Sequence, residues 1–284
     1  MSVYCATIGF FDGVHRGHRY VLQSLREISV AKSALPLIVS FREHPQTFFS
    51  QRSVPLLTLP KERLRLLERE GEVLMLSFAD IYRMTAKQFM EYLYQRSVRY
   101  LVLGYDHRFG SDRLTTLEQY KAVADEVGMQ VVQLCEYPQD HTHISSTVIR
   151  RLLQAGEVAE ANRLLGYHYT LTGVVVGGKQ LGRQLGFPTA NLSIAESKMI
   201  PQEGVYSAKI TLTDKTIKNG ILNIGTNPTV GGEERTCEVF IVDFKGDLYG
   251  QTIQVELNRH IREEKKFDTL DALRQQIQND LQSI

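Results

Sequence analysis

Short apolar runs alternate with helix-patterned segments through the first half of the chain. The runs have the length and content of buried strands, and they are Val3–Ile8, Leu35–Phe41, Val73–Phe78, Tyr100–Leu103 and Gln130–Leu134. Apolar residues recur at helical spacing between them, over 17–29, 60–70, 85–96 and 115–127. This alternation predicts a parallel sheet with helices on both faces. Because ligands bind at the carboxyl ends of such strands, we expect a site in the loops after Ile8 and Leu103.

The pattern changes in the middle of the chain. Residues 145–166 predict two short helices joined at Gly156. Turn signals then separate β-rich runs over 170–176, 205–212, 217–224, 238–244 and 252–257. Short strands at this spacing predict an antiparallel barrel, and an apolar stripe predicts a closing helix over 269–283. We therefore expect one domain over 1–156, a helical junction over 157–168 and a second domain over 169–284.

Composition narrows the class of protein. Lys and Arg total 33 against 32 for Asp and Glu, so a net charge of +1 does not favour nucleic-acid binding. No apolar run approaches the roughly 18 residues of a membrane span, and the N-terminus lacks the pattern of a secretory signal. The 3 cysteines are widely spaced and fit a reducing compartment. We expect a cytoplasmic protein that acts on small molecules without nucleic-acid or membrane partners; a homo-oligomer is left open.

The loop after the first predicted strand combines glycines with histidines and reads GFFDGVHRGH over 9–18. Gly9 and Gly17 would let a phosphate approach the backbone, where a helix start presents unpaired amide donors. His15 and His18 add donors suited to a triphosphate and to the charge that develops in nucleotidyl transfer. A glycine-rich turn with incidental histidines would explain this loop alone equally well. A metal pair at the two histidines lacks an evident third ligand.

Two further loops carry polar side chains next to predicted elements. ISSTVIR, over 144–150, offers hydroxyls that can cap a helix, with Arg150 one turn beyond Ser146. Hydroxyls, free amides and a guanidinium together suit the outer phosphates of ATP. GYDHRFG, over 104–110, offers Asp106, Arg108 and Phe109 to a planar polar ligand. Each loop alone indicates only a helix cap or a tight turn.

Together, GxFDGxHxGH, GYDHRFG and ISSTxIR resemble the bacterial bifunctional riboflavin kinase/FMN adenylyltransferase (FAD synthetase) family, as does SFREHP over 40–45. The resemblance implies an N-terminal α/β nucleotidyltransferase domain, Rossmann-like with a parallel sheet, that adenylylates FMN with ATP. It implies that His15 and His18 are catalytic and contact the ATP phosphates. The other ATP contacts that it implies are Gly9, Phe11, Gly17, Ser146 and Arg150. It places FMN beside His44, Asp106, Arg108 and Phe109.

The second half opens with a different glycine-rich loop, GVVVGGKQLGRQLGFPTANL over 173–192. It is not a P-loop, because no GxxxxGK is followed by Ser or Thr. Thr189 and Asn191 supply neutral oxygens two residues apart, which suit a Mg²⁺ ion that keeps waters and phosphate ligands. A mobile hairpin would also explain the glycines. Glu238 stands in an otherwise apolar run, either as a surface residue at a strand end or as a general base.

LGFPTANL, over 185–192, closely resembles the signature of riboflavin kinases. The resemblance implies an antiparallel β-barrel kinase domain with a C-terminal helix, in which Thr189 and Asn191 hold Mg²⁺ and Glu238 deprotonates the ribityl 5′-hydroxyl. It implies ATP contacts in the glycine-rich loop, at Gly177, Lys179 and Arg183. It implies flavin contacts at Arg262 and Phe267.

The resemblance therefore implies an enzyme of FAD biosynthesis that phosphorylates riboflavin to FMN and adenylylates FMN to FAD plus pyrophosphate, with ATP and Mg²⁺. Phe10 stands where asparagine is common in the family, and Phe240 where histidine is common, so substrate affinity is expected to differ. The short segment before Gly9 leaves room for a difference in the N-terminal lid. Two alternatives stay open: an enzyme with only the kinase active, and a flavin-binding regulator that has lost catalysis.

Overall fold

The computed structural model describes residues 2–49, 54–137, 144–178, 186–229, 232–265, 267 and 269–282. The chain divides into two compact units, Met1–Ser146 and Thr147–Ile284. Helix α7 (Ser146–Gln154) starts at this division, and Gly156, at a φ of 74°, joins it to α8 (Val158–Leu165). A left-handed φ of this kind favours glycine, so the turn between the two helices depends on that residue. Across the described ranges, no helix has the length and apolar character needed to cross a membrane.

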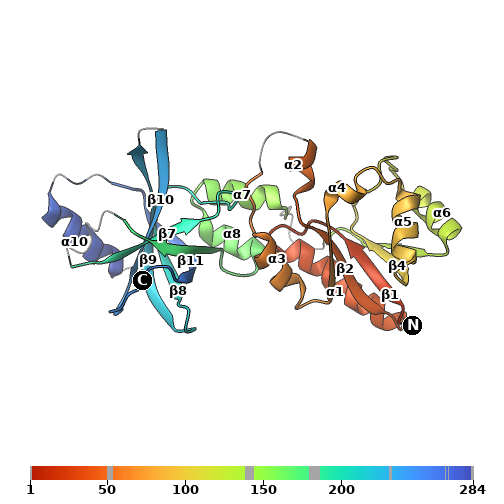
Figure 1. The fold of residues 1–284 in the computed structure, drawn as a ribbon, viewed down its shortest axis with the longest axis horizontal. Helices are drawn as coiled ribbons and strands as arrows, with labels where there is room; N and C mark the ends of the chain where they lie inside the picture. The colour runs from red at the N-terminus through yellow and green to blue at the C-terminus, as the bar shows by residue number, and fades with distance from the viewer. Residues whose placement is uncertain are drawn as a thin grey trace. The chain divides into compact units, whose positions relative to one another are not determined.

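The first unit contains a five-stranded parallel sheet in the order β3-β2-β1-β4-β5. Its strands are β1 (Tyr4–Ile8), β2 (Leu35–Phe41), β3 (Glu72–Leu76), β4 (Val98–Leu103) and β5 (Gln130–Gln133). The parallel sheet predicted from the sequence is confirmed (Figure 1). Because β1 and β4 are hydrogen-bonded neighbours, the loops that follow them leave the same edge of the sheet.

Helices cover both faces of this sheet, as the alternating pattern predicts. Cys5 packs with Leu22 in the core under α1 (Arg16–Ala31) and α3 (Pro60–Leu67). Its neighbour Ala6 packs with Met90 in the core under α5 (Ala86–Tyr94) and α6 (Leu117–Val127). Adjacent strand residues thus point to opposite faces, and each face has its own core. The described part of this unit also contains two short helices, α2 (Pro45–Phe49) and α4 (Phe78–Ile81).

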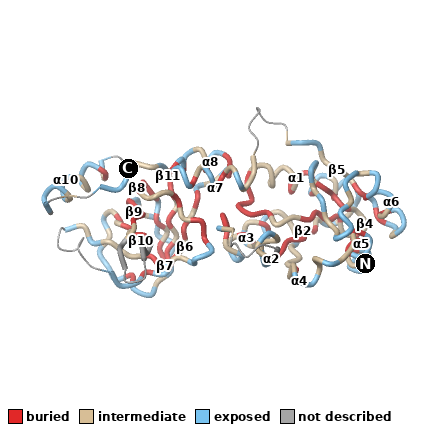
Figure 2. The backbone as a smooth tube through the Cα atoms, turned by 90° about the horizontal axis from the view of Figure 1, so that it is seen from above, coloured by how far each residue is buried: buried red, intermediate tan, exposed pale blue. Residues whose placement is uncertain are grey.

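The second unit is built on a closed barrel of antiparallel pairs, in the order β10-β7-β6-β11-β8-β9. The strands are β6 (Thr170–Val176), β7 (Thr189–Ile194), β8 (Gly204–Thr211), β9 (Ile217–Thr229), β10 (Gly232–Ile241) and β11 (Thr252–Arg262). Buried positions alternate along β11, where Ile253, Val255 and Leu257 are inaccessible to solvent. Figure 2 colours the backbone by burial and shows buried stretches in the barrel strands. The predicted antiparallel barrel is confirmed, and so is the C-terminal helix, α10 (Leu270–Leu281).

The structure differs from the sequence expectations at several strand boundaries, and one strand was not expected at all. Strands β9 and β11 run to Thr229 and Arg262, where ends at residues 224 and 257 were expected, and β10 begins at Gly232 and not at residue 238. Strand β7 was not expected, because only Leu192 among its residues is buried and the strand carries no apolar run. Strand β10 ends at Ile241 and not at residue 244, since Asp243 adopts a φ of 51° in a turn. Phe78, expected at the end of a strand, is the first residue of α4. The missed strand is half-exposed, and the two early ends lie at a turn and at a helix start, so the apolar signal is weak or misleading at these places.

Candidate active sites

The loop between β1 and α1 is held in an unusual backbone conformation. Phe11, Gly13 and Val14 have φ values of 55°, 80° and 36°. Such values are costly for residues with side chains and persist only where surrounding contacts impose them. The amide of Gly9 donates to Val39 O at 3.0 Å, which fixes the start of the loop on the sheet.

Asp12 anchors the middle of this loop, although the sequence analysis assigned it no role. Its buried carboxylate accepts hydrogen bonds from Leu57 N at 3.0 Å, Thr58 N at 2.9 Å and Thr58 Oγ1 at 3.1 Å. The Gly13 amide in turn donates to Thr58 Oγ1 at 2.9 Å. The only signal in the sequence is an aspartate between an apolar residue and a glycine, which is as typical of a simple turn.

His15 and His18 meet at the first turn of α1. His15 is the N-cap residue, and its Nδ1 accepts from the His18 amide at 3.3 Å. The two imidazole rings stack with centroids 3.6 Å apart. Burial, and secondarily the charge of His15, holds the pKa of His18 well below its usual value of 6.5. The His18 Nδ1 atom is buried and has no hydrogen-bond partner among the described residues. A neutral, incompletely bonded imidazole at a helix start is suited to a polar or anionic ligand.

This pKa shift gives a prediction about pH. Because the pKa of His18 is lower in the folded chain than in the unfolded chain, the unfolded chain binds the proton more tightly. We therefore expect a stability contribution that is present above pH 6.5 and is progressively lost as the pH falls below 6.5 towards the lowered pKa of the folded chain. Thermal unfolding at pH 7.5 and pH 5.5 would measure it, and His18→Gln should shrink the difference between the two melting temperatures. An equal difference in wild type and variant would contradict the prediction.

Ser146 connects the ISST segment to the same loop. Its hydroxyl donates to the backbone oxygen of Asp12 at 2.9 Å, although 134 residues separate the two in the sequence. Gly17 also lies beside this segment: a Cβ atom built at Gly17 would stand 3.8 Å from the backbone oxygen of Ile144. Arg150 lies one turn further along α7 and falls in the second unit.

A cavity of about 710 Å³ opens at the carboxyl edge of the sheet. Gly9 and Phe10 line it from the loop after β1, and Arg108 and Phe109 line it from the loop after β4. Both loops expected from the sheet topology thus contribute. Its apolar wall, which the sequence analysis did not single out, contains Phe41, Phe78, Ile81, Met84 and Phe89. A mostly apolar cavity with a few polar groups is typical of a small-molecule site.

Three expected residues lie around this cavity without lining it. Phe11 is buried and packs edge-on against the His18 ring at 5.2 Å. His44 contacts the ring of Phe10 at 4.5 Å. Asp106 is exposed. None of the three is among the residues that line the cavity, so their predicted roles remain predictions.

Arg63 is a buried cation that the sequence could not reveal. Its side chain is inaccessible to solvent, and its guanidinium lies 3.9 Å from the centre of the Phe10 ring. Nη2 donates to Phe41 O at 2.6 Å, whereas Nε and Nη1 have no partner among the described residues. Burial lowers its pKa to about 10, against the opposing effect of Asp12. In the sequence it is one of several charges on a short helix, and none of them is marked as buried.

In the second unit, strand register brings the expected kinase residues together. Strand β10 pairs with β7 so that Glu238 is opposite Asn191 and Phe240 is opposite Thr189. All four side chains therefore share one face. Thr189 Oγ1 donates to Glu238 Oε2 at 3.2 Å. The two side chains that sequence analysis proposed for metal binding and for proton removal are thus in the same place.

The glycine-rich loop approaches this face closely. A Cβ atom at Gly178 would stand 2.0 Å from Asn191 Nδ2, so any larger residue there would displace the Asn191 side chain. Gly177 is exposed, with open space around it. Lys179 and Arg183, the two expected ATP contacts beyond it, lie outside the described residues.

A second cavity, of about 260 Å³, adjoins Glu238. Thr189, Arg262 and Phe267, all expected from the sequence, line it together with Glu238. Asn191 does not line it. Asn223, to which the sequence analysis gave no role, lines the cavity from β9, where its register partner is Glu238. A carboxylate bonded to a threonine hydroxyl in a pocket of this kind can accept a proton from a bound alcohol.

An α/β unit with histidines at a helix start, followed by a barrel with a carboxylate in a pocket, is typical of a transferase that uses nucleotides. Comparison with known proteins agrees. An FAD synthetase family profile matches residues 2–148, and a riboflavin kinase profile matches residues 165–284. The chain therefore belongs to the family of bifunctional riboflavin kinase/FMN adenylyltransferases.

Individual relatives match over nearly the whole chain. The bifunctional riboflavin kinase/FMN adenylyltransferase of Escherichia coli K12 is 36% identical, over 96% of this chain and 89% of its own. The Bacillus subtilis enzyme of the same name is 33% identical, over 97% and 89%. A solved Streptococcus pneumoniae structure, described as a macrolide-efflux protein, superposes with a TM-score of 0.89 at 30% identity, over 99% of this chain and 94% of that one.

Proposed function

We propose that this chain makes FAD from riboflavin in two ATP-dependent steps, one in each unit. The barrel transfers the γ-phosphate of ATP to riboflavin, and the α/β unit transfers AMP from ATP to the resulting FMN. The observation that carries the proposal is the Thr189–Glu238 hydrogen bond in a pocket, in a chain whose other unit has the stacked His15–His18 pair. The phosphate added in the first step is the nucleophile of the second.

In the kinase step, Glu238 accepts the proton of the ribityl 5′-hydroxyl. The freed oxygen attacks the γ-phosphorus, and ADP leaves. The donor set fits Mg²⁺, because Thr189 and Asn191 place neutral oxygens on the face that carries the Glu238 carboxylate. The ion, when bound, neutralises phosphate charge. Gly177, Lys179 and Arg183 are proposed to bind ATP, and Arg262 and Phe267 to contact the flavin.

In the adenylyltransferase step, a phosphate oxygen of FMN attacks the α-phosphorus of ATP, and pyrophosphate leaves. No strong base is needed, because the nucleophile is already an anion. The chain's task is to position the reactants and stabilise developing charge. His15, His18 and the first amides of α1 are proposed to do this, with Gly9, Phe11, Gly17, Ser146 and Arg150 as further ATP contacts. We place the flavin ring in the 710 Å³ cavity beside Arg108 and Phe109, with Asp106 and His44 nearby.

A product assay tests the proposal. Purified protein is incubated with ATP and Mg²⁺, with riboflavin in one tube and FMN in another, and the flavins are separated by chromatography. We expect FMN and FAD in the first tube and FAD in the second. FMN without FAD in either tube would leave only a kinase. Bound flavin with neither product would favour a regulator without catalysis. We propose that the enzyme acts in the cytoplasm, on small-molecule substrates. Size-exclusion chromatography of the same preparation would determine whether copies of the chain associate.

A further inference from the structure

Helix α10 has one buried residue among those whose side chains are described, and that residue is a carboxylate. Asp280 is 2% exposed, while the other described positions of the helix are half-buried or exposed. An aspartate is almost never buried in this way unless it is paired. The burial of Asp280 therefore indicates a specific partner.

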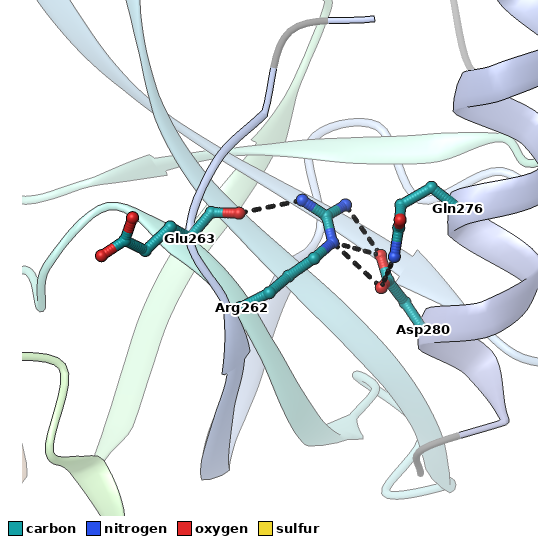
Figure 3. A network of polar contacts seen from close by, with 4 residues as sticks. All are labelled: Arg262, Glu263, Gln276 and Asp280. Atoms are coloured by element: carbon teal, nitrogen blue, oxygen red, sulfur yellow. Dashed lines mark hydrogen bonds and ion pairs between the residues drawn. The ribbon is translucent and has the colours of Figure 1, made fainter.

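That partner is Arg262, the last residue of β11 (Figure 3). Arg262 Nε donates to Asp280 Oδ1 at 3.0 Å and Oδ2 at 3.1 Å, and Nη2 donates to Oδ2 at 2.8 Å. Gln276, one turn earlier on α10, donates from Nε2 to Oδ1 at 2.8 Å. Arg262 Nη1 donates to Glu263 O at 2.9 Å. Both side chains are thus held in one orientation, and the arginine charge is neutralised.

This ion pair lies on the wall of the 260 Å³ cavity that contains Glu238. Leu273 and Ile277, on the same face of α10, line the cavity too. Phe267 lies with its ring centre 5.8 Å from the Arg262 guanidinium. The pair therefore fixes a planar guanidinium and one apolar helix face at the pocket, beside the Phe267 ring.

We propose that Asp280 is a positioning residue for riboflavin in the kinase reaction. Asp280 holds the Arg262 guanidinium and helix α10 in positions where the uncharged ring system of riboflavin can pack against them. The phosphates of ATP bind elsewhere in the unit. The proposal rests on the proposed kinase function. Its physical basis is that a guanidinium offers a flat stacking surface only when its orientation is fixed.

The test is Asp280→Asn in the full chain, which keeps the side-chain volume but removes the charge and one acceptor. We expect the KM for riboflavin to rise about tenfold, with the KM for ATP changed less than about twofold. Direct binding of riboflavin, followed by its fluorescence, should weaken by the same factor. Adenylylation of added FMN should be unchanged, because that reaction is proposed for the other unit. An unchanged KM for ATP and an unchanged melting temperature would show that the barrel is folded. Asp271→Asn, an exposed acid on the same helix, is the matched control and should change neither KM.

A second variant tests whether Asp280 acts through Arg262. Arg262→Lys should raise the riboflavin KM as well. The riboflavin KM of the double variant should not exceed that of the single variant with the higher KM. An unchanged riboflavin KM and affinity in Asp280→Asn would overturn the proposal, as would an equal rise in both KM values. Additive effects in the double variant would also overturn it. A wild-type chain without kinase activity would refute the proposed function instead, whereas the binding measurement would still test Asp280.

Discussion

Replacing Glu238 with glutamine is expected to lower riboflavin phosphorylation by about 10²–10⁴-fold, the usual contribution of a general base. Glutamine keeps the shape of the side chain and can still accept the hydrogen bond that Thr189 Oγ1 now gives at 3.2 Å. The barrel should therefore fold as before, and only the ability to take a proton is removed. The measurement is the initial rate of FMN formation from riboflavin at saturating ATP.

The same variant contains its own control, because adenylylation of added FMN should continue at the wild-type rate. Glu196→Gln, an exposed glutamate of the second unit, should leave both rates unchanged. If Glu238→Gln abolished both activities in a protein that melts like wild type, the assignment of two separate sites would be wrong. If FMN formation persisted, Glu238 would not be the base.

His18→Ala should have the opposite effect, lowering FMN adenylylation by about 10²–10³-fold while riboflavin phosphorylation continues. The imidazole stands at the first turn of α1, with a buried Nδ1 that has no partner in the described part of the chain. It is therefore available to a charge that develops on ligand phosphates. Unlike His15, it does not use its side chain to cap the helix, so its removal should leave α1 intact.

The measurement for His18 is the rate of FAD formation from FMN and ATP. Gln23→Ala, at an exposed position on the same helix, serves as the matched control and should keep full activity. Loss of kinase activity in a folded His18 variant would contradict the separation of sites. Full adenylyltransferase activity would remove His18 from the catalytic group.

Much of the fold could be predicted because burial leaves a periodic trace in the sequence. The parallel strands are covered on both faces, so they appear as unbroken apolar runs such as the one in β1, and the intervening helices carry one apolar stripe. Strand β7 left no such trace, because Leu192 is its only buried residue. Strand β7 nevertheless carries Thr189 and Asn191. The LGFPTANL motif was therefore recognised in the sequence, although the strand that contains these two residues was not predicted.

The sequence by itself determined the order of the two units and the class of each fold, and it supplied the residues now proposed for both sites. These properties depend on local pattern and on motifs of a few residues. The tertiary structure alone decided which polar side chains are paired. Asp12 meets Thr58, Thr189 meets Glu238 across 49 residues, and Asp280 meets Arg262. The burial of Arg63 was equally invisible. Register, barrel closure and helix packing set these distances, and no single segment of sequence encodes them.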